Sequence, residues 1–371
     1  MKKKPLVIWS ILTGVILIYV VMVLVSIQSN NDKLQKEIFQ DWYDSYVQKN
    51  SQGAFVNTSN DGSRPIALSE SQGYGMLAMV MAAKKGYIEE KEFIPFVTYY
   101  ENHQLSEDNY LMNWKQESIK GKWQNYDKNS ATDGDLDIAY ALIQASEIWS
   151  TSTINYEEKA VHLLKSIKDY TYNEKTKVLT VGNWATLSKE YWNLFRPSDV
   201  VPTHFDKFYN VTKDNFWQEV KENSLTYLTQ LSSQNEFGLI PDFAWIESND
   251  IVPAASKDVA TKDDGNYGYN SLRLPFRLAH SKDEKAKKVN EKLLTFLADQ
   301  EQVKAGYTLS GKALADYPSI SYSAPILLAT SEEKKFSGLY ADARWIMHEK
   351  VLGKDYYGDT LKVLSVLQLE L

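Results

Sequence analysis

Cysteine is absent from this chain of 371 residues, and its five histidines lie far apart in the sequence. Without cysteine no disulfide can form, so the hydrophobic core must hold the folded state together. The scattered histidines show no metal-ligand spacing, and no G-x-S-x-G elbow, phosphate-binding glycine loop or dinucleotide fingerprint is present. We therefore expect no metal and no cofactor.

Arginine is sparse, and acidic side chains outnumber basic ones, which gives a formal net charge of −7. An acidic chain is poorly suited to bind nucleic acid, and few arginines are available to clamp the uronates of a polysaccharide lyase substrate. No low-complexity linker and no tandem repeat divides the chain after its first 31 residues. We expect one large domain there.

The long uncharged run of the sequence lies near its N-terminus, at residues 5–27, and three lysines precede it. As a helix, residues 6–27 would rise roughly 33 Å, enough to cross a bilayer. The lysines favour a cytoplasmic N-terminus. A cleaved signal peptide is the alternative, but the run is long for one and Ser26-Ile27-Gln28 is a poor cleavage site. The sequence predicts a single-pass cell-membrane protein with a cytoplasmic tail at 1–4, a transmembrane anchor at 5–27 and an extracellular domain at 28–371.

Helical periodicity dominates this large domain, and strand signals are few. Nearly apolar, small-residue-rich stretches, such as 138–145, alternate with helices that carry a charged face, such as 283–297. This alternation predicts an all-α fold of two concentric rings, an (α/α) barrel with the apolar helices inside. The expected helices are 33–49, 70–85, 92–103, 135–149, 156–172, 213–231, 271–279, 283–300, 321–329, 334–351 and 359–369, with weaker candidates at 187–194 and 203–209 and one strand at 177–181.

Two of these helices begin with carboxylates, Glu70 and Asp133, just before their apolar stretches. Ser69 and Thr132 begin patterns typical of capping boxes, so both acids fall in a first helical turn, where the helix dipole alone could explain them. Gly73, however, interrupts the first helix at a cost in helix propensity, which a close backbone approach would justify. Both helices also turn apolar directly after the acids, so these ends point into the protein.

Glycoside hydrolysis uses a pair of acids, and aromatic rings nearby can stack on the sugars. Trp114 and Trp123 lie in a polar stretch between the two acids. A proton donor must keep its proton near neutral pH, so burial and a neighbouring carboxylate must outweigh the helix dipole at Glu70. Asp133 could supply that repulsion.

Several motifs occur in the order found in glycoside hydrolase family 8, which the chain resembles over about residues 65–330. They are SESQGYGM at 69–76, LMNW at 111–114, ATDGDLDIAYALIQASEIW at 131–149, RPS at 196–198, PDF at 241–243 and YGYNSLRLP at 267–275. The resemblance implies an (α/α)6 barrel and inverting endo-hydrolysis of a β-1,4-linked polymer such as cellulose, mixed-linkage glucan, chitosan or xylan oligomers.

Carried over position by position, the resemblance makes Glu70 the proton donor. Asp133 resembles the acid that touches the sugar in the cleavage subsite and stabilises its charge. Substrate-binding roles are implied for Gln72, Trp114, Tyr269, Asn270 and Arg273.

Asn270 departs from the family pattern, because cellulase-type members carry the general base, an aspartate, at this position. Asparagine cannot accept the proton of a water molecule. Chitosanase-type members also have asparagine there and take their base from a preceding loop. In this chain that loop is 247–265, and we expect Asp264 or its neighbour Asp263 to be the base. The other acids considered are Glu247, Asp250, Asp258 and Asp242, the last as a residue that shapes the cleft.

Two functions from different classes follow. The first is an anchored endoglycosidase that trims a surface polymer or the cell's own exopolysaccharide, with polysaccharide synthase machinery as a further expected partner. The second is a catalytically inactive polysaccharide-binding protein, which Asn270 favours. Glu70 and Asp133 argue against the second, since binding alone needs no proton donor.

Overall fold

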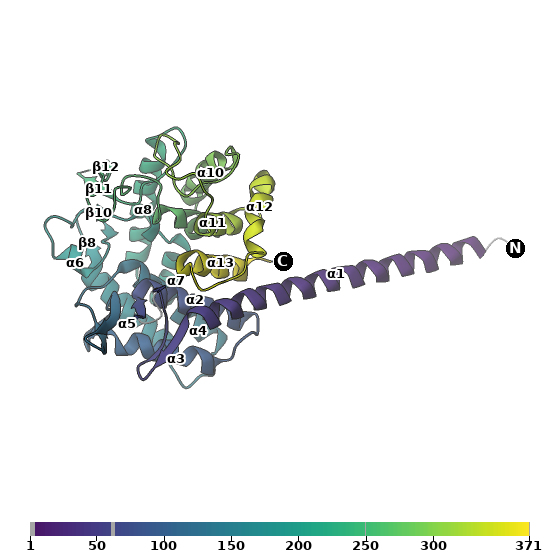
Figure 1. Cartoon of the computed structure of the whole chain (residues 1–371), viewed down its shortest axis with the longest axis horizontal. Helices are drawn as coiled ribbons and strands as arrows, with labels where there is room; N and C mark the ends of the chain where they lie inside the picture. Colours follow the sequence, from purple (N-terminus) through teal and green to yellow (C-terminus); the bar gives the residue numbers. More distant parts are fainter. Residues whose placement is uncertain (1–3, 61–63, 249, 371) are drawn as a thin grey trace.

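A computed structural model of the chain describes residues 4–60, 64–248 and 250–370, with the backbone alone at 4–11, 14, 18, 24–27 and 29. Most of the predicted cytoplasmic tail at 1–4 therefore lies outside the described residues. The chain forms a rounded body of helices, from which the N-terminal helix α1 projects (Figure 1).

The centre of the body is a closed ring in which each helix packs against the next, and the last against the first. Its members are α2 (Ser69–Lys84), α4 (Thr132–Ile148), α7 (Pro202–Thr212), α9 (Leu274–Leu278), α11 (Ile320–Thr330) and α13 (Tyr356–Gln368). Each inner helix also packs against one outer helix. In the same order these are α3 (Glu90–Asn102), α5 (Tyr156–Thr171), α8 (Phe216–Ser233), α10 (Glu284–Ala298), α12 (Ser337–Ala343) and α1 (Lys4–Tyr46). This double ring is the predicted (α/α)6 barrel.

Composition explains which helices lie inside. All residues of α11 after Ile320 are buried, and α4 is buried from Thr132 to Ala145 except at Tyr140. A helix that is apolar on every side can be satisfied only in the core. In α10, by contrast, the buried residues follow one stripe and the lysines face solvent. The alternation in the sequence therefore predicted the two rings correctly.

Helix α1 joins the barrel at its C-terminal end. Trp42 is fully buried, and its indole N–H donates to Oγ1 of Thr360 in α13 at 3.0 Å. Tyr46 donates to a carboxylate oxygen of Asp359 at 2.6 Å. The helix expected at 33–49 is thus the end of a longer one, and its last residues form β1 (Val47–Asn50) instead.

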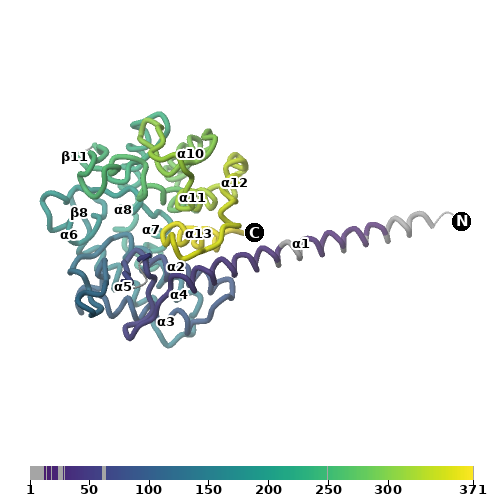
Figure 2. The backbone as a smooth tube through the Cα atoms, viewed as in Figure 1, coloured from purple at the N-terminus to yellow at the C-terminus, as the bar shows by residue number. Residues whose placement is uncertain are grey.

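The predicted anchor at 5–27 falls within the part of α1 that extends away from the body (Figure 2). Among the residues described in full, no helix is both long enough and apolar enough to cross a membrane. The anchor stays a prediction.

Two other expected helices differ from the structure. The segment expected at 334–351 is divided into η3 (Lys334–Phe336), α12 and η4 (Arg344–Met347). The segment expected at 187–194 is not helical after the short α6 (Asn183–Thr186). The side-chain amide of Asn173 donates to the carbonyl of Trp192 at 2.7 Å, which ties this stretch to a neighbouring hairpin instead. The weaker candidate at 203–209 is confirmed as part of α7.

Short antiparallel strands, most of which the sequence did not reveal, fill the loops. Several lead into inner helices: β3 (Ile66–Leu68) into α2, β6 (Lys115–Ile119) and β7 (Lys122–Asn125) toward α4, β10 (Leu194–Phe195) toward α7, and β11 (Ala244–Glu247) and β12 (Asp250–Pro253) toward α9. They therefore border the barrel end where the inner helices begin. The others are β2 (Gly53–Val56), β4 (Gln104–Ser106), β5 (Asn109–Met112), β8 (Tyr172–Asn173) and β9 (Val178–Leu179), the last within the expected strand.

Candidate active site

Two glycines let α2 and α4 touch where their acids begin. A Cβ built on Gly134 would lie 2.5 Å from the carbonyl carbon of Ser69 and 2.7 Å from the backbone nitrogen of Glu70. A Cβ on Gly73 would lie 2.8 Å from the Cβ of Asp137. The close approach predicted at Gly73 is therefore confirmed, and it brings the helix starts that carry Glu70 and Asp133 together.

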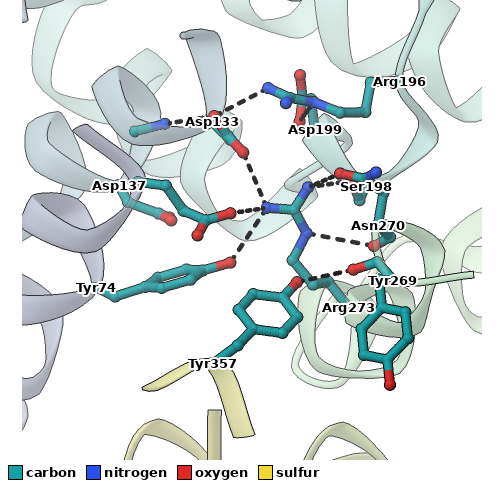
Figure 3. A network of polar contacts seen from close by, with 12 residues as sticks. Tyr74, Asp133, Asp137, Arg196, Ser198, Asp199, Tyr269, Asn270, Arg273 and Tyr357 are labelled. Carbon is teal, nitrogen blue, oxygen red and sulfur yellow. Dashed lines mark hydrogen bonds and ion pairs between the residues drawn. The ribbon is translucent and has the colours of Figure 1, made fainter. Parts of the chain in front are cut away.

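Arg273 connects the two acids. Its side chain is fully buried, and Nη1 donates to Oε2 of Glu70 at 3.1 Å and to Oδ2 of Asp133 at 2.9 Å (Figure 3). The same nitrogen lies 3.2 Å from the hydroxyl of Tyr74. One guanidinium nitrogen is thus shared by the two carboxylates that the sequence singled out.

Asn270 belongs to the same network. Nη2 of Arg273 donates to Oδ1 of Asn270 at 3.0 Å and to Oγ of Ser198 at 2.7 Å (Figure 3). The amide oxygen of Asn270 therefore helps to hold Arg273. Asparagine cannot serve as a base through this group.

A second arginine holds the other side of Asp133. Nη2 of Arg196 lies 2.9 Å from Oδ1 of Asp133, and Nε of Arg196 donates to Oδ1 of Asp199 at 2.7 Å. Burial alone would raise the pKa of Asp133, but Arg196 and Arg273 outweigh it and hold this pKa below its usual range. Asp133 is therefore ionised at neutral pH.

Glu70 has the opposite tendency. Its side chain is 22% exposed, and burial raises its pKa to about 7, with Arg273 opposing the shift and Asp133 adding to it. The neighbouring acids thus differ in protonation near neutral pH, which is the division of roles that separates a proton donor from a charge-stabilising carboxylate.

The other two aspartates of α4 are structural. Asp135 accepts the backbone N–H of Met112 at 2.8 Å, and burial raises its pKa well above the ordinary value. Both oxygens of Asp137 accept from Arg277, at 2.6 and 2.7 Å, and Oδ1 also lies 3.1 Å from Nε2 of His204.

The expected capping boxes are wrong, and Gln72 has a different place from the one predicted. The residues before the helices, Leu68 and Ala131, are the N-caps. Gln72 is fully buried, and its amide donates to the carbonyls of Ala54 and Phe96 at 3.1 and 2.9 Å. It therefore fastens α2 to β2 and α3.

Trp114 and Tyr269 lie beside the elements that carry this network, and their binding of substrate stays a prediction. The carbonyl of Trp114 accepts the backbone N–H of Ser69 at 3.0 Å, so this half-buried tryptophan lies beside the start of α2. Tyr269 is 48% exposed, and its carbonyl accepts the hydroxyl of Tyr357 at 2.9 Å (Figure 3). Tyr357 comes from α13, and no pattern in the sequence singles it out.

Asp264, the expected base, organises its own loop instead. Oδ2 accepts the N–H groups of Val259 and Ala260, and Oδ1 accepts the N–H and the hydroxyl of Thr261, at 2.8 to 3.2 Å. A carboxylate offers about four acceptor positions, so none remains for a water molecule. The structure therefore corrects the assignment of Asp264.

Asp242 fixes a turn next to this network. Its Oδ1 accepts the backbone N–H groups of Gly268, Asn270 and Ser271 at 2.7 to 3.1 Å. These bonds fix the turn that leads into η2 (Ser271–Arg273), and so they position Arg273.

Sequence reasoning missed Asp199. The motif RPS at 196–198 ends directly before this residue. Asp199 lies in η1 (Pro197–Asp199), and burial raises its pKa to about 6 while Arg196 opposes the shift. An arginine and an aspartate three residues apart, beside the apolar Val200 and Val201, were the available signal.

Two neighbouring carboxyl groups lie where the inner helices of an (α/α)6 barrel begin, one with a raised and one with a lowered pKa. This arrangement is typical of a glycoside hydrolase. The chain matches the model of glycosyl hydrolases family 8 over residues 13–370, and it belongs to that family. It is accordingly an endo-acting, inverting glycoside hydrolase, as its motifs implied.

Individual proteins agree with this assignment. The chain is 29% identical to a β-glucanase of Niallia circulans, over 92% of this chain and 85% of that one. It is 30% identical to an endoglucanase of Bacillus sp. strain KSM-330, over 93% of this chain and 77% of that one. The apo structure of a β-1,3-1,4-glucanase from Paenibacillus sp. X4 superposes with a TM-score of 0.83 at 29% identity, over 91% of both chains.

Replacing Gly134 by alanine should damage both stability and activity. The added methyl overlaps the backbone at Ser69 and Glu70, so the helices must shift at a cost of about 1–3 kcal/mol. A displacement of Glu70 by about 1 Å can lower the rate roughly 100-fold. Thermal unfolding and reducing-sugar release measure the two effects.

Gly338→Ala in α12 is the matched control, because nothing lies within 4 Å of the added Cβ. It should leave activity unchanged and raise stability by up to about 1 kcal/mol. Wild-type stability and activity in Gly134→Ala would contradict the close-contact explanation.

Proposed function

We propose that this protein hydrolyses a β-1,4-linked polysaccharide, with Glu70 as proton donor and Asp133 as the carboxylate that faces the sugar at the cleavage point. The observation that carries the proposal is that one nitrogen of the buried Arg273 donates to both carboxylates. Burial raises the pKa of Glu70 to about 7, whereas Arg196 and Arg273 hold the pKa of Asp133 below its usual range.

Under this proposal each residue has one task. Glu70 delivers its proton to the leaving oxygen as the glycosidic bond breaks. Asp133 stays ionised and stabilises the positive charge that develops on the sugar ring. Arg273 keeps the two carboxyl groups at a fixed separation, while Trp114 and Tyr269 offer ring faces on which sugars stack.

A glucan with β-1,4 linkages is the substrate we favour. The names of the similar proteins, a β-glucanase, an endoglucanase and a β-1,3-1,4-glucanase, support this choice. If the protein is anchored at the cell surface, its polymer is the cell's own exopolysaccharide or another surface polymer. Polysaccharide synthase machinery is then an expected partner.

An inactive polysaccharide-binding protein is the second candidate. It is favoured by Asn270, whose amide oxygen accepts from Arg273 in the position where related cellulases have a base. It requires that no other carboxylate replace that base.

Reducing-sugar release from cellulose derivatives, mixed-linkage glucan, chitosan and xylan distinguishes the two candidates. We expect the wild type to cut at least one polymer and Glu70→Gln to be slower by about 100- to 10,000-fold, since the amide has no proton to deliver. Early NMR spectra should show the α-anomer as the first product. The matched control Glu301→Gln, at an exposed glutamate, should keep full activity.

Equal rates for wild type and Glu70→Gln would contradict the assignment of the donor. Binding without release from every polymer by the wild type would favour the inactive protein.

We also propose that residues 5–27 anchor the protein in the cell membrane with the catalytic domain outside. Three lysines precede this uncharged run, α1 continues through it, and Val15, Ile16 and Leu17 are more than half exposed, at 59%, 55% and 59%. Apolar side chains in such a run gain by leaving water.

The wild type should remain in the membrane fraction after a carbonate wash, whereas Val15→Lys/Leu17→Lys should be released, because each central lysine costs about 2.5–3.5 kcal/mol of insertion. A cysteine placed at the exposed Lys189, the sole thiol of that variant, should react with an impermeant maleimide on intact cells. Native protein free in the medium with its N-terminus near residue 28 would contradict anchoring.

A further inference from the structure

Inversion needs a second carboxylate, which takes the proton from the attacking water. Asn270 cannot do so, and the acceptor positions of Asp264 are filled by its own loop. Asp242 is engaged by three backbone N–H groups beneath the turn that precedes Arg273. These three side chains are therefore unsuited, and the site as described so far has a donor but no assigned base.

We propose that Asp199 is the general base. Its Oδ1 accepts from Nε of Arg196 at 2.7 Å, whereas no group within the described parts of the chain donates to its Oδ2. The side chain keeps 10% of its surface exposed, so it is neither sealed in the core nor free in solvent. Oδ2 is thus available to hold a water molecule.

Asp199 is connected to the donor through Asp133. Oδ2 of Asp133 is joined through Arg273 to Glu70, and Oδ1 of Asp133 is joined through Arg196 to Asp199. Donor and base therefore come from different elements, α2 and η1, and contact the carboxylate that faces the sugar through different arginines. Inversion requires a separation of about 6.5–9.5 Å between them.

The electrostatics agree with this geometry. Burial raises the pKa of Asp199 to about 6 against the charges of Arg196 and Arg273, and the negative charge of Asp133 adds to the rise. Glu70 has a pKa of about 7. Between these values an ionised Asp199 and a protonated Glu70 coexist, which is the state that an inverting enzyme needs before attack.

The step balances, and it rests on the proposed function. The water oxygen bonds to the anomeric carbon while Oδ2 of Asp199 takes its proton. The bond from that carbon to the glycosidic oxygen breaks, and its electron pair stays on the oxygen, which takes the proton of Glu70. Proton exchange with solvent then restores both acids.

The test is Asp199→Asn in the full-length protein, assayed on the best polymer of the panel. We expect kcat to fall about 100- to 10,000-fold with KM changed less than threefold, since the amide keeps the shape and loses the basicity. The acidic limb of the pH profile, near 6, should disappear. Sodium azide should restore turnover of a β-linked activated glycoside and yield the α-glycosyl azide, because azide attacks without a base.

Asp299→Asn is the matched comparison, since Asp299 is exposed at the end of α10 in the outer ring. It should stay within threefold of the wild type. An Asp199→Asn protein with near-wild-type kcat overturns the proposal. A loss of activity with weakened polymer binding or a lowered unfolding temperature, and without azide rescue, also overturns it and leaves Asp199 a structural role. Failure of the proposed function would appear instead in the wild type or in Glu70→Gln.

Discussion

The shared bond from one buried guanidinium to two carboxylates is the constraint on which this site depends. Arg273 is fully buried, and a charge in that position is tolerable only if it is paired and hydrogen-bonded on all sides. Asp133 supplies the opposite charge, and Arg196 reinforces its ionised form from the other side. Burial is the main cause that favours the protonated form of Glu70, and the charge of Asp133 adds to it while Arg273 opposes it. The division into donor and stabiliser thus follows from burial together with this arrangement of charges.

The barrel holds these carboxyl and guanidinium groups in place. Gly73 and Gly134 let α2 and α4 approach until their first turns touch, which fixes where the two acids begin. Asp242 fixes the turn before η2 through three backbone N–H groups, which sets the root of the Arg273 side chain. The carboxyl and guanidinium groups come from elements far apart in the sequence, so only a rigid double ring can hold them within hydrogen-bonding distance.

Local patterns in the sequence were enough to predict the rings, and they pointed to Glu70 and Asp133 as a pair. Arg273 was expected to bind substrate, whereas in the structure its buried side chain binds the two acids. They were not enough where the outcome depends on direction or on distant partners. Gln72 lies two residues from Glu70, yet its amide points to β2 and α3. Asp264 was preferred for its nearness to Tyr269 along the chain, but its oxygens turn toward its own loop. The role proposed for Asp199 depends on Arg196 and on Asp133, which lies far from it in the sequence. The short hairpins are held by strand pairing, and an alternation over two to five residues is too short to predict it.

The central claim is that Glu70 holds its proton near neutral pH while Asp133 does not. A carboxyl ¹³C NMR titration of the full-length protein, with the two signals assigned by their loss in Glu70→Gln and Asp133→Asn, tests this claim directly. The account predicts that the Glu70 signal titrates with a midpoint of about 7 and that the Asp133 signal shows the ionised form throughout that range. A Glu70 midpoint at the ordinary value for a glutamate, or an Asp133 that takes up a proton at the same pH as Glu70, would contradict it.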